Sequence, residues 1–171
     1  MLSYFELFGI PVTLRPDKAD LRRRFFERSR EAHPDHYARE SDAAQAEALE
    51  RSAQLNKAYK TLTDEDELAR YVLQEKGLMQ PEEKYALAPD FLMEMMELNE
   101  EVPDALSDAA ARERLMERLR QWKNEIYAPV ENTMEHYQEG VTSEKELLQV
   151  KEYYYRKKYL QRLAGQLGQK L

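Results

Sequence analysis

The chain has 171 residues, of which 42% are hydrophobic and 35% are charged, and its formal net charge at pH 7 is −7. It contains no cysteine, which excludes disulfides, thiolate metal sites and cysteine nucleophiles. The acidic balance argues against a dedicated nucleic-acid binder, and no stretch approaches the roughly 18 apolar residues that a membrane span needs. Few glycines and prolines, with abundant Lys, Glu, Arg, Leu and Ala, predict an all-α fold.

The N-terminal part of the chain carries a pattern typical of four helices. Gly9 stops a short apolar segment at residues 4–8. Pro34 ends a second helix, because the residue before a proline is pushed out of the α region. The apolar stripe of this second helix recurs at helical spacing and consists of Leu21, Phe25, Ser29 and Ala32. A third helix, capped by Ser41 or Asp42, follows it, and a fourth occupies residues 65–76.

The next stretch of sequence separates two lobes. One glycine and two prolines interrupt residues 77–90, and we place a linker at residues 77–88. Beyond it, three amphipathic stretches predict an antiparallel three-helix bundle over residues 89–171. Their stripes are Phe91, Met95, Leu98 and Val102, then Leu115, Leu119, Trp122, Ile126 and Val130, then Val150, Tyr153, Leu160, Leu163 and Leu167. Pro129 predicts a kink in the second of these helices.

The tripeptide His33-Pro34-Asp35 stands at the end of the second helix. A metal site would use His33 and His36, but zinc sites need three or four ligands and the only other histidine is His136. A catalytic His–Asp pair would need a nucleophile, and no GxSxG elbow, HExxH helix or Gly-rich phosphate loop is present. Two interpretations of the tripeptide then remain. It is either a helix end with proline as its stop signal or a recognition loop.

The helix that leads into this tripeptide is strongly basic in an acidic chain. Five arginines lie within residues 22–30. On a helical wheel Arg22, Phe26, Arg30 and His33 share one side, and Arg23 lies beside them. Such a face is either a solvated surface or a surface that meets an acidic partner.

The tripeptide and its flanking segments resemble the J-domain family, in which four helices carry an HPD loop between the second and the third. The resemblance spans residues 1–76 and rests on the segments YFELFGI, LRRRFFERSREAHPD and LNKAYKTLTD. It implies docking on an Hsp70 chaperone and stimulation of its ATP hydrolysis. The Hsp70-binding residues that we assign are His33, Pro34, Asp35, Arg22, Arg23 and Arg30. Phe26 and Glu27 depart from the basic run usual in the family at this point.

The segment PDFLMEMMELNEEVPDAL, residues 89–106, resembles the HscB (Jac-type) co-chaperones of iron–sulfur cluster assembly, in which a J-domain joins a three-helix bundle. The Gly/Phe-rich linker and CxxCxGxG repeats of general J-proteins are missing from the sequence. The resemblance implies two lobes in an L-shaped arrangement, and an HscA-like Hsp70 and an IscU-like scaffold as partners. No cofactor is expected, because a chain without cysteine leaves the cluster on its scaffold.

The same segment is unusual for a bundle helix. Its core stripe leaves Leu92, Met93 and Met96 on neighbouring faces, and residues 82–104 hold eight acidic residues and one lysine. A widened buried face explains the apolar residues without any function, whereas an apolar strip rimmed by acid fits a partner with basic edges. The resemblance implies the second explanation. The scaffold-binding residues that it implies are Leu92, Met93, Met96, Glu97, Glu100, Asp104 and Tyr155, the last as an exposed interface aromatic.

The sequence therefore predicts a non-enzymatic co-chaperone that brings an IscU-like scaffold to an HscA-like Hsp70 and stimulates its ATPase during cluster assembly and transfer. The alternative is a general J-protein whose bundle binds unfolded clients. A third hypothesis is a helical nucleic-acid-binding protein that uses the arginines of residues 22–30. The start of the chain, MLSYFELFGI, lacks the features of a signal peptide or transit segment, which predicts a cytoplasmic protein.

Overall fold

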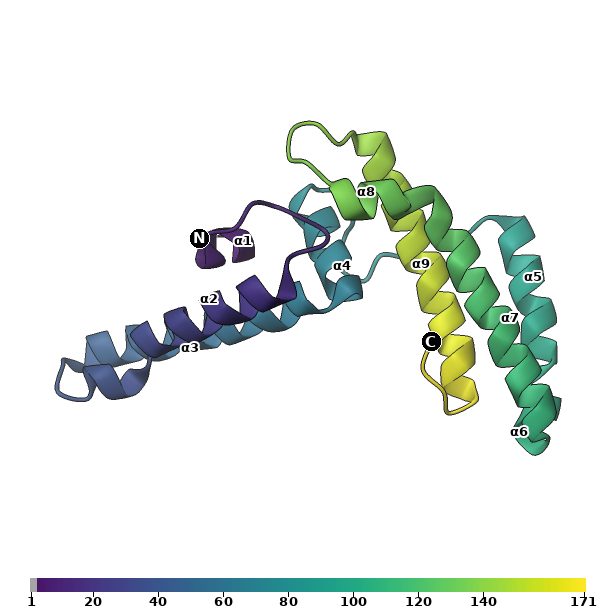
Figure 1. Ribbon diagram of the computed structural model, residues 1–171, viewed down its shortest axis with the longest axis horizontal. Helices are drawn as coiled ribbons and strands as arrows, with labels where there is room; N and C mark the ends of the chain where they lie inside the picture. The colour runs from purple at the N-terminus through teal and green to yellow at the C-terminus, as the bar shows by residue number, and fades with distance from the viewer. Residues whose placement is uncertain (1–2) are drawn as a thin grey trace. The chain divides into compact units, whose positions relative to one another are not determined.

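The computed structural model describes residues 3–171, and all regular structure in that range is helical (Figure 1). The predicted all-α class is confirmed, while the first two residues of the expected J-domain lie outside the described range. The chain divides into two compact units. The first runs to Val72 and takes in Glu135–Val141, and the second comprises Leu73–Met134 and Thr142–Leu171. Among the described residues, the helices are too short or too polar for any of them to cross a membrane.

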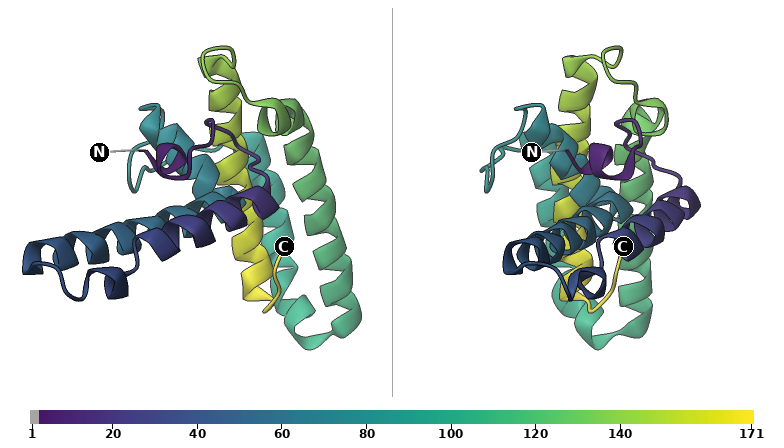
Figure 2. Two further views of the ribbon diagram at one scale, coloured as in Figure 1. Left: turned by 60° about the vertical axis from the view of Figure 1, so that its left-hand side comes forward. Right: turned by 90° about the vertical axis from the view of Figure 1, so that its left-hand side faces the viewer.

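The first unit is built around a hairpin of two helices that lie side by side (Figure 2). Its elements are α1 (Tyr4–Phe8), α2 (Lys18–Glu31), the 3-10 turn η1 (Pro34–Tyr37), α3 (Asp42–Thr63) and α4 (Glu65–Glu75). The order of four helices, with the tripeptide between the second and the third, is the predicted one. The 3-10 turn is an addition, because the sequence predicted a loop after the tripeptide.

Side-chain caps fix where the two long helices of this unit begin. Asp17 accepts a hydrogen bond from the Asp20 N–H at 2.9 Å at the start of α2. Ser41 Oγ accepts one from the Ala44 N–H at 3.2 Å at the start of α3. Each cap satisfies a backbone donor that the first helical turn leaves without a partner. Of the two predicted caps of α3, Ser41 is therefore the one that is used, and Asp42 is the first helical residue.

Aromatic rings fill the space between the helices of the first unit. Phe25 stacks on Tyr59 of α3 with a centroid distance of 4.2 Å and an interplanar angle of 13°, and Phe8 of α1 packs 6.4 Å from Phe25. Leu21 and Ala32 at the two ends of the predicted stripe are each 1% exposed. The stripe is confirmed as the buried face of α2, which turns the arginines of this helix outward or to its sides.

The second unit contains the predicted bundle of three long helices. Its elements are α5 (Pro89–Glu100), α6 (Val102–Ser107), α7 (Ala109–Tyr127), the 3-10 turn η2 (Ala128–Val130), α8 (Glu131–His136), which ends at the boundary of the units, and α9 (Glu144–Gln166). In the core, Met95 of α5, Leu119 of α7 and Val150 and Leu160 of α9 are each 0% exposed. All four belong to the predicted stripes, so the three buried faces are confirmed.

Two prolines shape the turns of this unit. The predicted kink at Pro129 is confirmed as the 3-10 turn η2, which links α7 to α8. The short helix α6 was not predicted, because the sequence placed Val102 in the same helical stripe as Phe91, Met95 and Leu98. Pro103 lies in the first turn of α6. Proline favours this position because the N–H groups of a first turn have no intrahelical partner anyway.

Residues 77–88, which the sequence predicted as a linker, contain no helix but pack onto α9. We call this segment the strap. Met79 is 3% exposed. Lys151 Nζ of α9 donates to the Leu78 carbonyl at 2.7 Å and forms an ion pair with Glu83 at 2.7 Å. The strap is therefore fastened to the bundle by both apolar and polar contacts.

Candidate functional site

The tripeptide forms a turn that its own atoms hold in place. His33 is the residue before η1, and its imidazole Nδ1 accepts a hydrogen bond from the Asp35 N–H at 3.2 Å. The His36 N–H donates to the His33 carbonyl at 3.0 Å. Pro34 begins the 3-10 turn, where its fixed φ suits the backbone and its missing N–H costs nothing. The turn is thus held by hydrogen bonds of its own, and it packs against α3.

The two polar side chains of this turn face solvent. The His33 side chain is 55% exposed and that of Asp35 is 91% exposed, with 3.5 Å between Nδ1 and the nearer carboxylate oxygen. Because Nδ1 accepts the Asp35 N–H, the neutral imidazole carries its proton on Nε2, which is then free to donate outward. The turn therefore presents one donor and one carboxylate acceptor side by side.

Two of the five arginines of α2 lie against the end of α1. Arg24 Nη1 donates to the Phe8 and Gly9 carbonyls, both at 3.1 Å, and Arg24 Nε pairs with Asp20 at 2.8 Å. Arg28 approaches the same turn, since a Cβ at Gly9 would lie 3.0 Å from its Nη2. Gly9 also has a φ of +62°, which favours glycine. Both guanidinium groups therefore lie at the end of α1, whose carbonyls attract cations.

Arg23 forms its ion pairs within α2. It forms ion pairs with Asp20 at 2.6 Å and with Glu27 at 3.0 Å. The hydrogen bond from Arg23, followed by that from Arg24, lowers the pKa of the Asp20 carboxyl, and the Asp20 and Glu27 partners raise the pKa of Arg23. A partner protein that uses Arg23 would have to compete with these carboxylates.

Arg22 and Arg30 are placed differently from the other three arginines. Both are exposed, and within residues 3–171 neither forms an ion pair. The Arg22 guanidinium lies over the ring of Phe26, 5.5 Å from its centroid. The predicted set of Arg22, Arg23 and Arg30 thus contains two free cations and one that is already paired. Phe26, to which the sequence assigned no role, is 51% exposed between them.

This division of the arginines predicts different effects on stability. Arg24→Ala is expected to lower the free energy of unfolding by about 1–2 kcal/mol, because two carbonyls at the end of α1 lose their donor. Arg22→Ala is expected to change it by less than about 0.5 kcal/mol, as is usual for exposed positions. Urea unfolding followed by circular dichroism measures both values. Equal losses of unfolding free energy in the two variants would contradict the view that Arg24 stabilises the fold and Arg22 does not.

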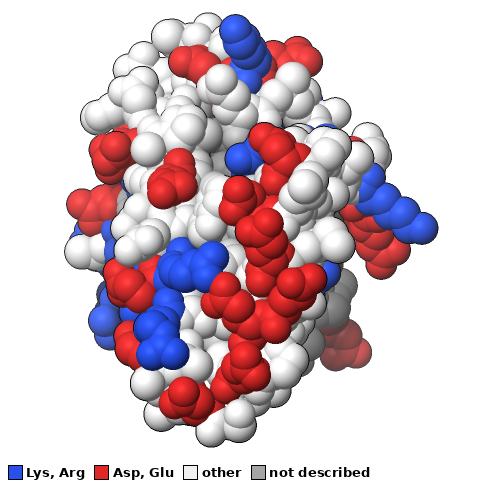
Figure 3. Space-filling view, turned by 90° about the vertical axis from the view of Figure 1, so that its right-hand side faces the viewer, with Lys and Arg blue, Asp and Glu red and all other residues white. Residues whose placement is uncertain are grey.

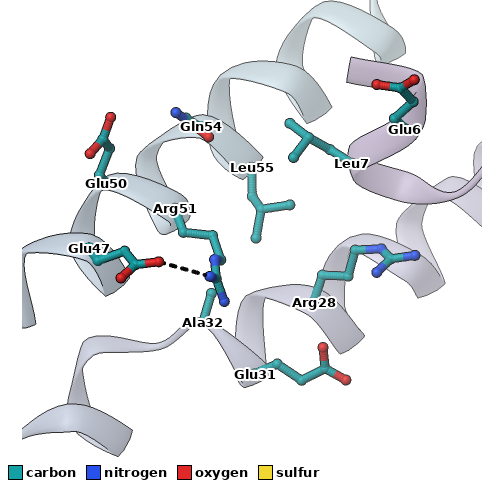
Figure 4. Close-up of a pocket in the computed structure, with 10 residues that line it drawn as sticks. All are labelled: Glu6, Leu7, Arg28, Glu31, Ala32, Glu47, Glu50, Arg51, Gln54 and Leu55. Atoms are coloured by element: carbon teal, nitrogen blue, oxygen red, sulfur yellow. Dashed lines mark hydrogen bonds and ion pairs between the residues drawn. The ribbon is translucent and has the colours of Figure 1, made fainter. Parts of the chain in front are cut away.

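A pocket of about 500 Å³ lies on another face of α2, between this helix, α1 and α3 (Figure 4). Leu7, Leu55 and Ala32 contribute apolar surface to it, and four glutamates, one glutamine and two arginines line the rest. One of these arginines, Arg51, is paired with Glu47 at 3.3 Å. Arg28, which also lines the pocket, follows Arg22 by six residues, about 240° around the helix. The pocket is therefore separate from the face that carries the free cations.

The second candidate surface lies on α5. Met93 and Met96 are 64% and 60% exposed, and Leu92 is partly exposed. The core stripe of the same helix is buried, with Phe91 and Met95 only 2% and 0% exposed. The methionines therefore do not widen the buried face. They form an apolar strip on the outside of the bundle, and flexible methionine side chains suit an adaptable contact surface.

Carboxylates follow one side of this strip. Glu97, Glu100 and Asp104 are exposed, as the sequence predicted. Figure 3 looks at the side on which α5, α6 and α7 lie in Figure 1, and acidic side chains gather in a column along it. Glu101 at the end of α5 is paired with Arg118 of α7. The surface thus joins an apolar strip to a negative edge.

Tyr155, the last predicted scaffold residue, lies in a different environment. Its ring is half-buried and stacks on Tyr85 of the strap, with a centroid distance of 4.6 Å and an interplanar angle of 4°. Its hydroxyl donates to Glu83 at 3.5 Å, and burial, followed by the Glu83 charge, raises its pKa. Burial and the hydrogen bond to Glu152 raise the pKa of Tyr85 to about 12. The sequence predicted an exposed ring, and the strap covers part of it.

Metal chemistry finds no support in these surroundings. Across residues 3–171, no group of three or more His, Cys, Asp or Glu side chains is placed to hold a metal ion. His33 and His36 lie in the exposed turn, and the pocket between α1, α2 and α3 contains no cluster of this kind. Both surfaces are suited to recognition of a partner. One unit offers a hydrogen-bond donor, a carboxylate and free cations, and the other offers an apolar strip with carboxylates beside it.

Comparisons with known proteins fit both units. A family model described as the HSCB C-terminal oligomerisation domain matches residues 87–168. A co-chaperone protein HscB homolog from Bordetella avium is 33% identical over 164 residues, covering 95% of this chain and 96% of the relative. Another from Chromobacterium violaceum is 40% identical over 119 residues, 69% of this chain and 68% of the relative.

Solved structures extend the likeness to the fold of nearly the whole chain. Chaperone HscB from Vibrio cholerae aligns with a TM-score of 0.76 at 27% identity, over 98% of this chain and 96% of that one. Human co-chaperone protein HscB aligns with a TM-score of 0.81 over 98% of this chain and 81% of that one. At 24% identity the human protein is similar in fold alone.

Proposed function

Because the chain belongs to the HscB family of co-chaperones, we propose that it brings an IscU-like iron–sulfur scaffold to an HscA-like Hsp70 and stimulates the ATPase of that Hsp70. The protein itself would carry out no chemical step. Its place of action would be the cytoplasm. Two surfaces on two units would each hold one partner.

The observation that carries the proposal is the ordered turn whose polar side chains are exposed next to free cations. His33 and Asp35 offer a donor and an acceptor that the fold does not use for packing, and Arg22 and Arg30 have no internal carboxylate partner within the described residues. Paired charges across an interface steer encounter and fix the orientation of the partner. A partner with an acidic surface and a cationic group opposite Asp35 fits these four side chains.

The α5 surface supports the second half of the proposal. Its exposed methionines and acidic rim suit one folded partner with an apolar patch and basic edges. A chain that holds both partners raises the effective concentration of each near the other, up to the millimolar range for short connections. ATP hydrolysis on the Hsp70 would thereby be coupled to the scaffold and to the cluster that the scaffold carries.

The experiment that tests this function is single-turnover ATP hydrolysis by the HscA-like Hsp70 of the same organism. The additions are this protein, the scaffold, both together, and both with His33→Gln in place of the unchanged chain. His36→Gln is the matched control, because it alters the neighbouring exposed histidine in the same way. Synergy between protein and scaffold that His33→Gln loses and His36→Gln keeps is the expected result.

Other outcomes discriminate among the alternatives. Stimulation by this protein that the scaffold does not increase, but that an unfolded polypeptide does, would favour the general J-protein. Absence of stimulation of any Hsp70 would refute the proposed function. Binding to DNA or RNA that weakens steeply with salt would then favour the nucleic-acid hypothesis.

A further inference from the structure

Phe26 is a large aromatic side chain that the fold leaves half in solvent, at 51% exposure. One part of its ring is nevertheless fixed. It packs 5.7 Å from Phe25, at an interplanar angle of 57°, and Phe25 in turn stacks on Tyr59 of α3 at 4.2 Å. Phe26 is therefore the outermost ring of an aromatic series that runs from Tyr59 through Phe25 to the surface.

The surroundings of this ring combine apolar surface with positive charge. Arg22 lies one turn before Phe26 and covers part of the ring at 5.5 Å, and Arg30 lies one turn after it. From Arg22 to Arg30 the face extends about 12 Å along the axis, because each residue of an α-helix adds about 1.5 Å. The face leads directly into the turn of His33 and Asp35.

We propose that Phe26 is an apolar anchor of the Hsp70-docking surface, and that the Hsp70 receives it in a pocket that is apolar at its centre and acidic at its rim. This inference rests on the proposed function and adds the residue that selects the partner. A carboxylate on the rim would reach Arg22 while the ring enters the pocket, and desolvation would strengthen both the ion pair and the cation–π contact.

The neighbouring charges indicate why an anchor is needed here. Glu27 follows Phe26 and is tied to Arg23, so this pair brings little net charge to the surface. Charge alone then discriminates poorly among acidic partners. An aromatic ring between two free cations disfavours a partner that has an acidic rim but no apolar centre. In such a complex the ring would cover polar groups of the partner, and these groups would lose their hydrogen bonds.

The test compares Phe26→Ala and Phe26→Leu with Leu49→Ala. Leu49 is a matched control, since it is 62% exposed and lies on α3 of the same unit. The ATPase of the HscA-like Hsp70 is measured against the concentration of each variant. Phe26→Ala is expected to raise the concentration for half-maximal stimulation about tenfold, as the loss of an aromatic anchor does, with the maximal stimulation unchanged. Phe26→Leu is expected to lose less, and Leu49→Ala nothing.

The unchanged chain and His33→Gln are measured in the same series, so that two kinds of failure are separated. If the unchanged chain stimulates and His33→Gln does not, but Phe26→Ala matches Leu49→Ala, the inference is overturned and the proposed function stands. If Phe26→Ala lowers the stability to urea and leaves the half-maximal concentration unchanged, Phe26 is a packing residue and the inference is again overturned. If the unchanged chain fails to stimulate the ATPase, both the inference about Phe26 and the proposed function are refuted.

Discussion

Asp35→Asn is expected to weaken stimulation of the Hsp70 ATPase by about thirtyfold or more. The substitution removes one negative charge and keeps the size of the side chain. The carboxylate is 91% exposed, and the N–H that donates to His33 belongs to the backbone, so the turn keeps its structure. Removing one member of a buried, hydrogen-bonded charge pair in an interface costs about 2 kcal/mol or more, which is roughly thirtyfold. Single-turnover hydrolysis at saturating Hsp70 measures the loss.

Glu40→Gln is the control for this variant. Glu40 is an exposed carboxylate between the same two long helices, so the change in net charge of the chain is identical. The control is expected to stimulate as the unchanged chain does. Equal losses in both variants would mean that the general charge of the loop, and not the Asp35 carboxylate, acts on the Hsp70. The role assigned to the tripeptide would then be wrong.

The double variant Met93→Glu with Met96→Glu is expected to weaken scaffold binding about a hundredfold or more. Two mostly exposed methionines leave the centre of the α5 surface, and two carboxylates enter a region that is already acidic. Losing two apolar side chains that become buried in the complex costs about 3 kcal/mol or more of binding free energy, which is roughly a hundredfold in the dissociation constant. Titration calorimetry with the purified scaffold measures the affinity directly.

The same variant contains an internal control. Its stimulation of the Hsp70 in the absence of scaffold is expected to stay unchanged, because the substitutions lie in the other unit. Val141→Glu, at a position that is 73% exposed in the loop after α8, controls for an added surface charge. Scaffold binding that survives in the double variant would place the scaffold elsewhere on the chain.

Local signals in the sequence predicted most of the fold. Apolar residues at helical spacing identified the buried faces of α2, α5, α7 and α9, since a helix must bury one stripe wherever it packs. Pro34 marked the end of α2, and Pro129 marked the 3-10 turn after α7. Both act through the fixed geometry of proline, which does not depend on distant residues. The outward position of Met93 and Met96 did not follow from this periodicity, which also allowed a widened buried face, and was expected from the family resemblance.

Features that depend on distant residues were beyond the reach of the sequence. Five arginines in one helix are alike as residue types, yet Arg24 differs from Arg22 because only Arg24 meets the carbonyls at the end of α1. Tyr155 was expected to be exposed, and the strap that covers it is about seventy residues away in the chain. Helical periodicity gives the direction of a side chain relative to its own helix, and it does not reveal what a segment without periodicity will cover.

The way in which the strap is fastened bears on the order in which the protein folds. Its polar contacts with α9 join Leu78 to Lys151 and Glu83 to Tyr155, across sequence separations of 73 and 72 residues. Closing such a long loop costs conformational entropy, and this cost is offset only when the segments at its two ends are already folded and can contact each other. Each helix, by contrast, forms from residues that are near neighbours in the chain. The helices of the bundle are therefore expected to assemble first. The strap then closes over a finished α9 and is the first part of this unit to come loose when the protein is destabilised.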